Sequence, residues 1–219
     1  MSTIPASETQ RTDSQSPSGV GESHQAMQTA RRLTWLMFAL CLIVTGTAAV
    51  YESAGFAPAA LIGAAGLLSM LGWQAAETKR RPVPVSFIVP YSLVVMSLLV
   101  QNAEEFAFRS MDSSVFSSVP GFALYSIGAA SLFMLGGAAL AARHPLGAWS
   151  AWLVCIWAAV QSLAHYAYPL FSDSRYFYIP GQAAAWIPLL VGLYGLIRLI
   201  RGPRRSSTLI HEGGKSDVR

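Results

Sequence analysis

The chain has 219 residues, of which 53% are hydrophobic and only 12% are charged, and its formal net charge is +4. This charged share is about half that of an ordinary soluble domain, and the charges gather in the tails and in short gaps between long apolar stretches. A soluble core does not hide so much apolar surface, so the composition excludes a soluble globular protein and predicts an integral membrane protein. The basic balance marks the sidedness of membrane loops, and we expect no nucleic-acid binding.

Residues 1–30 are rich in Ser, Thr, Gln and Gly and hold almost no aliphatic cluster. This composition predicts a disordered tail, and the first apolar segment then acts as an uncleaved signal anchor. Six apolar segments follow, each close to the 17–25 residues that a spanning helix needs. They cover about 33–51, 57–73, 85–108, 119–142, 146–168 and 179–200. Pro180 is expected to begin the last segment, and Pro169 to close the fifth.

The sequence therefore predicts an all-α, polytopic transmembrane bundle of about six spanning helices, placed in the cell membrane as a multi-pass protein. Lys and Arg at the segment ends divide ten to two between the two sides of this arrangement. The positive-inside rule then places both termini in the cytoplasm. The second segment is short and rich in glycine, and a re-entrant path for it would change this orientation.

Polar residues cluster where the third and fifth segments end. Gln101, Glu104 and Glu105 fall on one face of the third segment, and Arg109 follows Glu105 by one helical turn. His165 shares a face of the fifth segment with Gln161, Ser162 and Tyr168. Both segments run outward, so the two faces are expected at one membrane level, together with Glu52, Tyr176 and Tyr178. Ionisable groups at membrane depth are costly, which makes this level a candidate functional site.

Each of these residues also has a plain structural interpretation. Glu104 and Glu105 could end a helix at the headgroup boundary, with Arg109 neutralising one of them. Tyr176 and Tyr178 could belong to the interfacial aromatic belt, and His165 could make one interhelical hydrogen bond. The group of Glu104, Glu105 and His165 favours a site because three ionisable residues share one level.

With these residues in view, residues 85–200 resemble the HXXEE-domain family of bacterial integral membrane proteins. The resemblance rests on the sequence from Gln101 to Glu105, on the later His165, and on a Tyr-x-Pro-Gly turn beginning at Tyr178. Gln101 stands where the family has its leading His, and a glutamine neither shuttles protons near neutral pH nor binds transition metals well. The resemblance implies a four-helix domain over 85–200 and an enzyme of unassigned reaction. Residues 31–84 become a two-helix N-terminal addition, and 201–219 a basic disordered cytoplasmic tail.

A second similarity is to the EExxxR motif of the CAAX-type intramembrane proteases, carried by Glu104, Glu105 and Arg109. His165 supplies a second motif in part, because Gln161 stands where that motif has Phe, and the third motif has no counterpart. A third similarity, of the sequence EEF to the acidic motif of small lycopene-cyclase subunits, rests on very few residues.

Three functions follow from these observations. The first is a membrane enzyme that uses acid–base chemistry on a lipid or isoprenoid substrate. The second is a metal-dependent intramembrane hydrolase, and the third is a transporter or partner subunit with a proton or cation site. The sequence names no cofactor or metal and gives no oligomeric state.

Within the acid–base hypothesis, six residues have expected roles. Glu105 pairs with Arg109 and stays ionised, whereas Glu104 has Phe108 at the corresponding position and is the better proton donor. His165 and Glu105 orient substrate or stabilise developing charge, with Tyr178 at the same level. Gln101 is expected to hydrogen-bond one of the two carboxyl groups.

Overall fold

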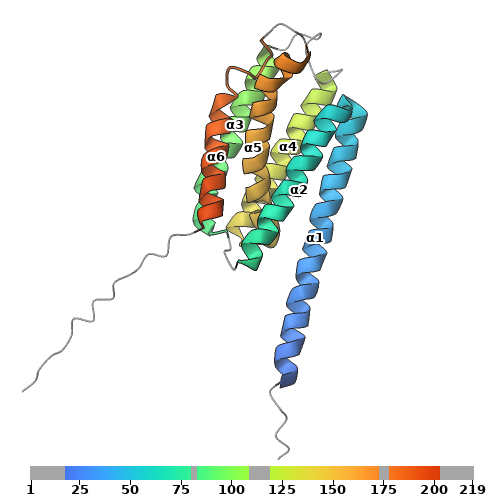
Figure 1. The fold of residues 1–219 in the computed structure, drawn as a ribbon, viewed down its shortest axis with the longest axis vertical. Helices are drawn as coiled ribbons and strands as arrows, with labels where there is room; N and C mark the ends of the chain where they lie inside the picture. Colours follow the sequence, from blue (N-terminus) through green and yellow to red (C-terminus); the bar gives the residue numbers. More distant parts are fainter. Residues whose placement is uncertain (1–17, 80–82, 109–118, 173–177, 203–219) are drawn as a thin grey trace, which may run out of the picture.

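The computed structural model describes residues 18–79, 83–108, 119–172 and 178–202 of the chain. These residues form six α-helices and one short 3₁₀ turn, which together make an up-and-down bundle (Figure 1). The helices are α1 (Ser18–Ala54), α2 (Phe56–Thr78), α3 (Ile88–Ala107), α4 (Val119–Ala141), α5 (Pro145–Ser172) and α6 (Trp186–Arg201), with the 3₁₀ turn η1 (Val85–Phe87) leading into α3.

Helix α5 lies at the centre of the bundle, where it contacts α2, α3, α4 and α6. In the apolar window of its Pro145–Ala167 span, 61% of the residues are buried, whereas the corresponding share for the Thr29–Glu52 span of α1 is 17%. The difference arises because α1 packs mainly against α2 at the edge of the bundle. Helix α6 lies close to α5 at Gly192, where a Cβ would lie 2.9 Å from the carbonyl oxygen of Cys155. Small residues permit this packing of helix backbones, which is the usual way that helices associate in membranes.

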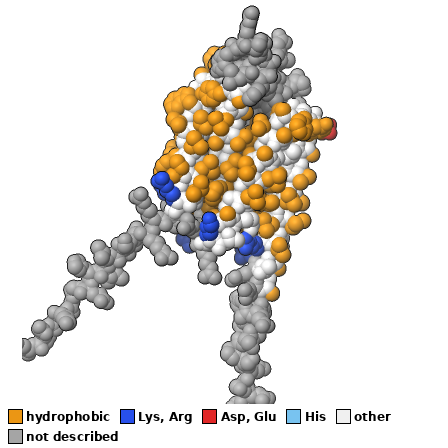
Figure 2. Space-filling view, viewed as in Figure 1, with side chains coloured by type: hydrophobic (Ala, Val, Ile, Leu, Met, Phe, Trp, Pro, Cys, Tyr) orange, Lys and Arg blue, Asp and Glu red, His pale blue; other side chains and the backbone are white. Residues whose placement is uncertain are grey.

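The bundle carries the surface of a membrane protein. Large apolar side chains such as Met37, Leu71, Val89 and Met134 are exposed on its sides. Figure 2 shows hydrophobic side chains spread over the face that it displays. Among the described residues, four helical stretches are long and apolar enough to cross a bilayer: Thr29–Glu52, Phe56–Thr78, Val85–Ala107 and Pro145–Ala167. The predicted all-α membrane helix bundle is thereby confirmed. Phe56–Thr78 has the length of a full span, as the second predicted segment requires.

Helices α4 and α6 complete the bundle beside these four spans. Helix α4 contributes the shorter apolar stretch Tyr125–Ala141. Helix α6 has 16 residues, or about 24 Å of helix, against a hydrocarbon core of about 30 Å. The six helices alternate in direction, so the beginning of α1 and the end of α6 lie at the same end of the bundle (Figure 1). The described Lys and Arg side chains gather at that end in Figure 2.

Four boundaries differ from the prediction: α2 ends at Thr78 instead of near residue 73, and the other three have a physical explanation. Helix α1 begins at Ser18, so it includes residues 18–30, which were expected to lie in a disordered tail. Its first turns extend beyond the other helices (Figure 1), and helix propagation from the apolar span accounts for them. Helix α5 continues past Pro169 to Ser172, because proline removes only one donor near a helix end.

The fourth boundary is the start of the last helix. Helix α6 begins at Trp186, and residues 180–185 form turns instead of the helix expected from Pro180 onward. Gly181 has a φ of +88°, in the left-handed region, which ends any regular helix there. This segment of turns carries the backbone that reaches the candidate site.

Candidate functional site

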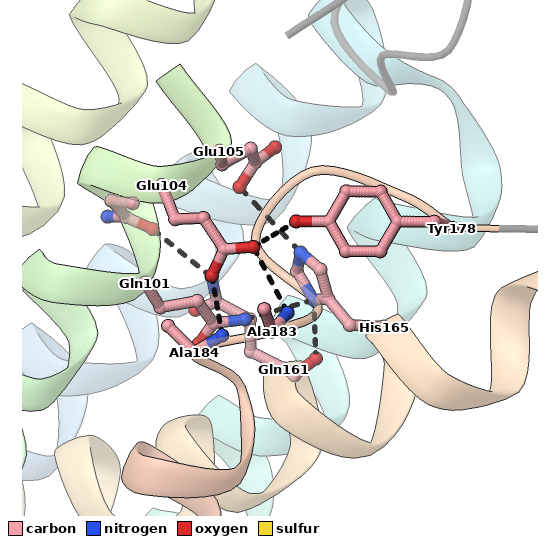
Figure 3. A network of polar contacts seen from close by, with 9 residues as sticks. Gln101, Glu104, Glu105, Gln161, His165, Tyr178, Ala183 and Ala184 are labelled. Carbon is pink, nitrogen blue, oxygen red and sulfur yellow. Dashed lines mark hydrogen bonds and ion pairs between the residues drawn. The ribbon is translucent and has the colours of Figure 1, made fainter. Parts of the chain in front are cut away.

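The fold brings five of the six predicted site residues together at one end of the bundle (Figure 3). Gln101, Glu104 and Glu105 come from the last two turns of α3, and His165 comes from α5. Tyr178 comes from the segment that leads into α6. The sixth, Arg109, lies outside the described residues, as does Tyr176. The polar faces of the third and fifth segments were expected at one membrane level, and they meet there through two contacts between α3 and α5, Gln101 with His165 and Asn102 with Gln161.

His165 is held by its Nδ1 atom, which lies 2.9 Å from the backbone oxygen of Gln161 and 3.2 Å from Nε2 of Gln101. A carbonyl oxygen only accepts, so the bond to Gln161 requires a hydrogen on Nδ1. A protonated Nδ1 cannot also accept from an amide nitrogen, and the two contacts agree when the Gln101 amide is turned so that its oxygen faces the ring. The neutral imidazole then keeps its lone pair on Nε2.

The free Nε2 atom of His165 faces Glu105. Its distance to Oε2 of Glu105 is 3.7 Å, and the two side chains are only 14% and 16% exposed. The expected partner Arg109 lies outside the described residues, and His165 is the partner that the described contacts give Glu105. A carboxylate beside an oriented imidazole stabilises the imidazolium form, so the pair is arranged to hold or transfer one proton.

Glu104 has a different environment. Its Oε1 accepts hydrogen bonds from the Tyr178 hydroxyl and from the backbone N–H of Ala183, the latter at 3.1 Å, and its Oε2 accepts from the backbone N–H of Ala184. Three donors directed at one carboxyl group match its ionised, acceptor-only form. Glu104 therefore satisfies the backbone donors just before α6, in the manner of a helix cap supplied by another helix.

One expected contact is corrected by this geometry. Gln101 was expected to hydrogen-bond a carboxyl group, and it contacts the ring of His165 instead. Its side chain lies at the α3–α5 contact and is fully buried, so it faces the imidazole. The role of Glu104 as the proton donor remains a prediction, and its three hydrogen-bond donors give this carboxyl group a second possible role as an anchor of the chain before α6.

Gly181 lies directly against the Glu105–His165 pair. A Cβ at this position would be 3.1 Å from Nε2 of His165 and 3.3 Å from Cβ of Glu105. The left-handed φ of +88° also favours glycine here. The Tyr-x-Pro-Gly turn thus places bare backbone over the pair, which sequence spacing alone did not indicate.

Other residues of the network came from weaker sequence signals. Gln161 was placed on the polar face of its helix, and its Nε2 donates to Oδ1 of Asn102 at 3.3 Å. Asn102 was not singled out, although an amide beside Gln101 on a membrane helix could have indicated it. Glu52 is exposed in the last turn of α1 and is not part of the network in Figure 3. The side chain of Tyr168 lies outside the described part of the chain.

Two buried oxygen atoms near these elements, Oε1 of Gln101 and Oγ of Ser162, have no hydrogen-bond partner among the described residues. Buried polar atoms are normally paired, so their presence is consistent with a site that receives water or a polar part of a ligand. For Gln101, turning the amide as described above pairs the oxygen with His165 and presents the NH₂ group in its place.

A metal ion fits the described residues poorly. Within the described ranges, no group of three or more His, Cys, Asp or Glu side chains is arranged to hold a metal. The oxygens of Glu104 already accept three hydrogen bonds, which leaves Glu105 and His165 as two facing groups. A metal centre here would need ligands beyond the described residues.

Comparisons with known proteins place the chain in no group: we find no matching family model, no matching curated protein and no matching solved structure.

Proposed function

We propose that this protein is an integral membrane enzyme that transfers a proton to or from a lipid or isoprenoid substrate, with Glu105 and His165 as the acid–base pair. The observation that carries the proposal is the oriented imidazole of His165, with Nδ1 bound to the Gln161 carbonyl and Nε2 3.7 Å from Glu105. An imidazole fixed in this way has one defined basic nitrogen, which general acid–base catalysis requires.

In the proposed reaction, Nε2 of His165 takes a proton from one carbon of the substrate, and the Glu105 carboxylate stabilises the imidazolium that forms. The same proton is returned to another carbon, so that a double bond moves and no other atom is gained or lost. Gln101 and Gln161 act as positioning residues, because they hold the ring and do not face its reactive nitrogen. The apolar surroundings of a bilayer suit this substrate class.

Glu104 has a positioning role in this proposal. It binds the turn that carries Tyr178, Ala183 and Ala184, and the same turn brings Gly181 against the acid–base pair. The HXXEE resemblance supports the assignment, because its glutamates, later histidine and Tyr-x-Pro-Gly turn are the elements that meet here. We propose membership of that family on the same basis.

The test is an untargeted lipid analysis of cells that lack the gene and are complemented by variants. Glu105→Gln and His165→Gln should accumulate to wild-type levels and retain the lipid profile of the deletion strain. Glu52→Gln is the matched control, because Glu52 is an exposed carboxylate outside the network, and it should restore the wild-type profile.

If each of the two single variants, Glu105→Gln and His165→Gln, restored the wild-type lipid profile, the proposal would be contradicted. An unchanged lipid profile in every strain, combined with proton flux into proteoliposomes that depends on Glu105, would indicate a transporter instead. Stoichiometric metal in the purified protein, lost in Glu105→Gln, would favour the hydrolase hypothesis.

A further inference from the structure

The opposite end of the bundle contains a cavity of about 440 Å³. It lies where α2 and α4 end, where α5 begins, and beside residues 83–85. Its charged or titratable lining side chains are Glu77, Arg143 and His144, and the other lining residues are apolar or proline. A volume in this range accommodates a small ligand or a lipid headgroup.

The cavity lies at the ends of the candidate membrane spans, which is where lipid headgroups are expected. The α2 span ends at Thr78, the α3 span begins at Val85 and the α5 span begins at Pro145, so every lining residue is within about a turn of a span boundary. Figure 2 shows the described Lys and Arg side chains at this end of the bundle. A ligand in this place therefore meets the bilayer surface, and basic pockets between helix ends commonly receive lipid headgroups.

The cavity offers hydrogen-bond donors for an anion. Nδ1 of His144 accepts a hydrogen bond from the backbone N–H of Leu146 at 3.3 Å, so the hydrogen of the neutral ring is on Nε2, which is a donor. The ring is fixed by an edge-on contact with Trp35, at 4.4 Å between ring centroids. Arg143 adds a guanidinium, whose planar donors match a phosphate.

The backbone conformation at Arg143 is one that usually requires glycine, which indicates that the arginine side chain has a function here. His144 N–H bonds to the Ala139 oxygen and Arg143 N–H to the Leu140 oxygen, which is the Schellman pattern that ends α4. Arg143 occupies the left-handed position of this motif, with a φ of 55°, where glycine is the usual residue. Arginine at a position that favours glycine is accounted for when its side chain has a task in the cavity.

Glu77 gives the cavity a second, opposite charge. A purely anionic ligand would be repelled by this carboxylate, whereas a headgroup with both a phosphate and a primary ammonium satisfies all three side chains. We propose that this cavity binds the headgroup of an aminophospholipid, with the phosphate on Arg143 and His144 and the ammonium on Glu77. This site is separate from the Glu105–His165 pair, at the other end of the bundle.

The test uses the full chain, purified in detergent and stripped of lipid. Native mass spectrometry then measures the binding of lipids that are added back. Phosphatidylethanolamine, phosphatidylglycerol and phosphatidylcholine are the probes, each at the same mole fraction, with inorganic phosphate as a fourth. Phosphatidylethanolamine should bind most tightly. Arg143→Gly should weaken its binding about tenfold or more without lowering the stability of the lipid-free protein, because glycine suits the backbone there. Arg143→Gln provides a second variant if the glycine protein does not accumulate.

Glu77→Gln should remove the preference for phosphatidylethanolamine over the other two lipids and leave phosphatidylglycerol binding intact. Arg201→Gln is the matched control, because Arg201 is exposed near the same end and does not line the cavity. An Arg201→Gln effect as large as that of Arg143→Gly would overturn the proposal in favour of diffuse charge attraction. Equal binding of phosphatidylcholine by the wild type, or thermal stabilisation by inorganic phosphate that matches the lipid, would also overturn it.

Discussion

The two ends of the bundle carry polar residues in different ways. At the site end, Glu104, Glu105 and His165 turn inward and are partnered by other parts of the chain. At the basic end, residues such as Lys79 and Arg201 are exposed beside the membrane boundary. A charge that only sets the orientation of the protein in the membrane needs no partner, whereas a charge within the bundle needs a hydrogen-bond or ion-pair partner. The comparison separates the residues that orient the protein from those that could carry chemistry.

The largest expected effect concerns which side of the membrane each end faces. In a background without Cys41 and Cys155, Glu52→Cys should react with an impermeant thiol reagent in intact cells. Lys79→Cys should react only after the membrane is permeabilised, because the positive-inside rule places the basic end in the cytoplasm. Both positions are exposed, so burial does not limit the reaction. Reaction of Lys79→Cys in intact cells would show that the basic end faces outward, opposite to the orientation predicted here.

The second prediction tests the anchoring role of Glu104. Glu104→Ala removes the acceptor of three hydrogen bonds and leaves the N–H groups of Ala183 and Ala184 unpaired. Hydrogen bonds to charged groups contribute about 1.5–3 kcal/mol each and do not add fully, so the free energy of unfolding should fall by about 3 kcal/mol. Unfolding in detergent micelles measures it, with Glu52→Ala as a control that should change little. Unaltered stability with lost function would return the catalytic role to Glu104.

The third prediction concerns the turn over the acid–base pair. Gly181→Ala places a Cβ at a φ of +88° and 3.1 Å from Nε2 of His165, so it should cost about 1–2 kcal/mol of stability. Gly128→Ala is the matched control, because a Cβ at this position in α4 meets no atom within 4 Å. That variant should be as stable as the wild type or slightly more stable. Equal stability of both variants would show that the turn does not approach His165 as described.

The helices were largely predictable from the sequence because long apolar runs have few other folded states in a bilayer. The runs 57–73 and 119–142 correspond to α2 and α4, and the alternation of directions brought Glu105 and His165 to one end. The ends of α1 and α6 were less predictable. Helix propagation carries α1 back to Ser18, and the backbone at Gly181 delays α6 to Trp186.

The partners within the site could not be predicted from spacing along one helix. Glu104 and Glu105 are adjacent in sequence, yet they point to different elements, the turn before α6 and the ring of His165. Which partner each carboxyl group contacts depends on the rotation of α3 against α5 and on the path of residues 178–185. The cavity beside Arg143 was also unpredictable, because it forms from the ends of several helices that are distant in sequence.

The smallest expected effect concerns Tyr178, which lies outside the membrane-spanning segments, just before the turns that lead into α6. Its hydroxyl donates to Glu104, and this carboxylate raises the pKa of Tyr178 to about 12 from the ordinary value of 10.0, because the ionised phenol could no longer donate and would be repelled. A pKa raised by folding gives stability that is complete below about pH 10 and is lost as the pH rises toward 12.

Tyr178 is 53% exposed, so Tyr178→Phe should cost less than about 1 kcal/mol at neutral pH. The difference in tyrosinate absorbance between the wild type and Tyr178→Phe should titrate about two pH units above an ordinary tyrosine. Repeating the difference measurement in a Glu104→Gln background removes the negative charge, and the midpoint should then move back toward 10. A midpoint near 10 in the wild type would mean that Glu104 and Tyr178 do not meet, and that the turn before α6 is held by its backbone contacts alone.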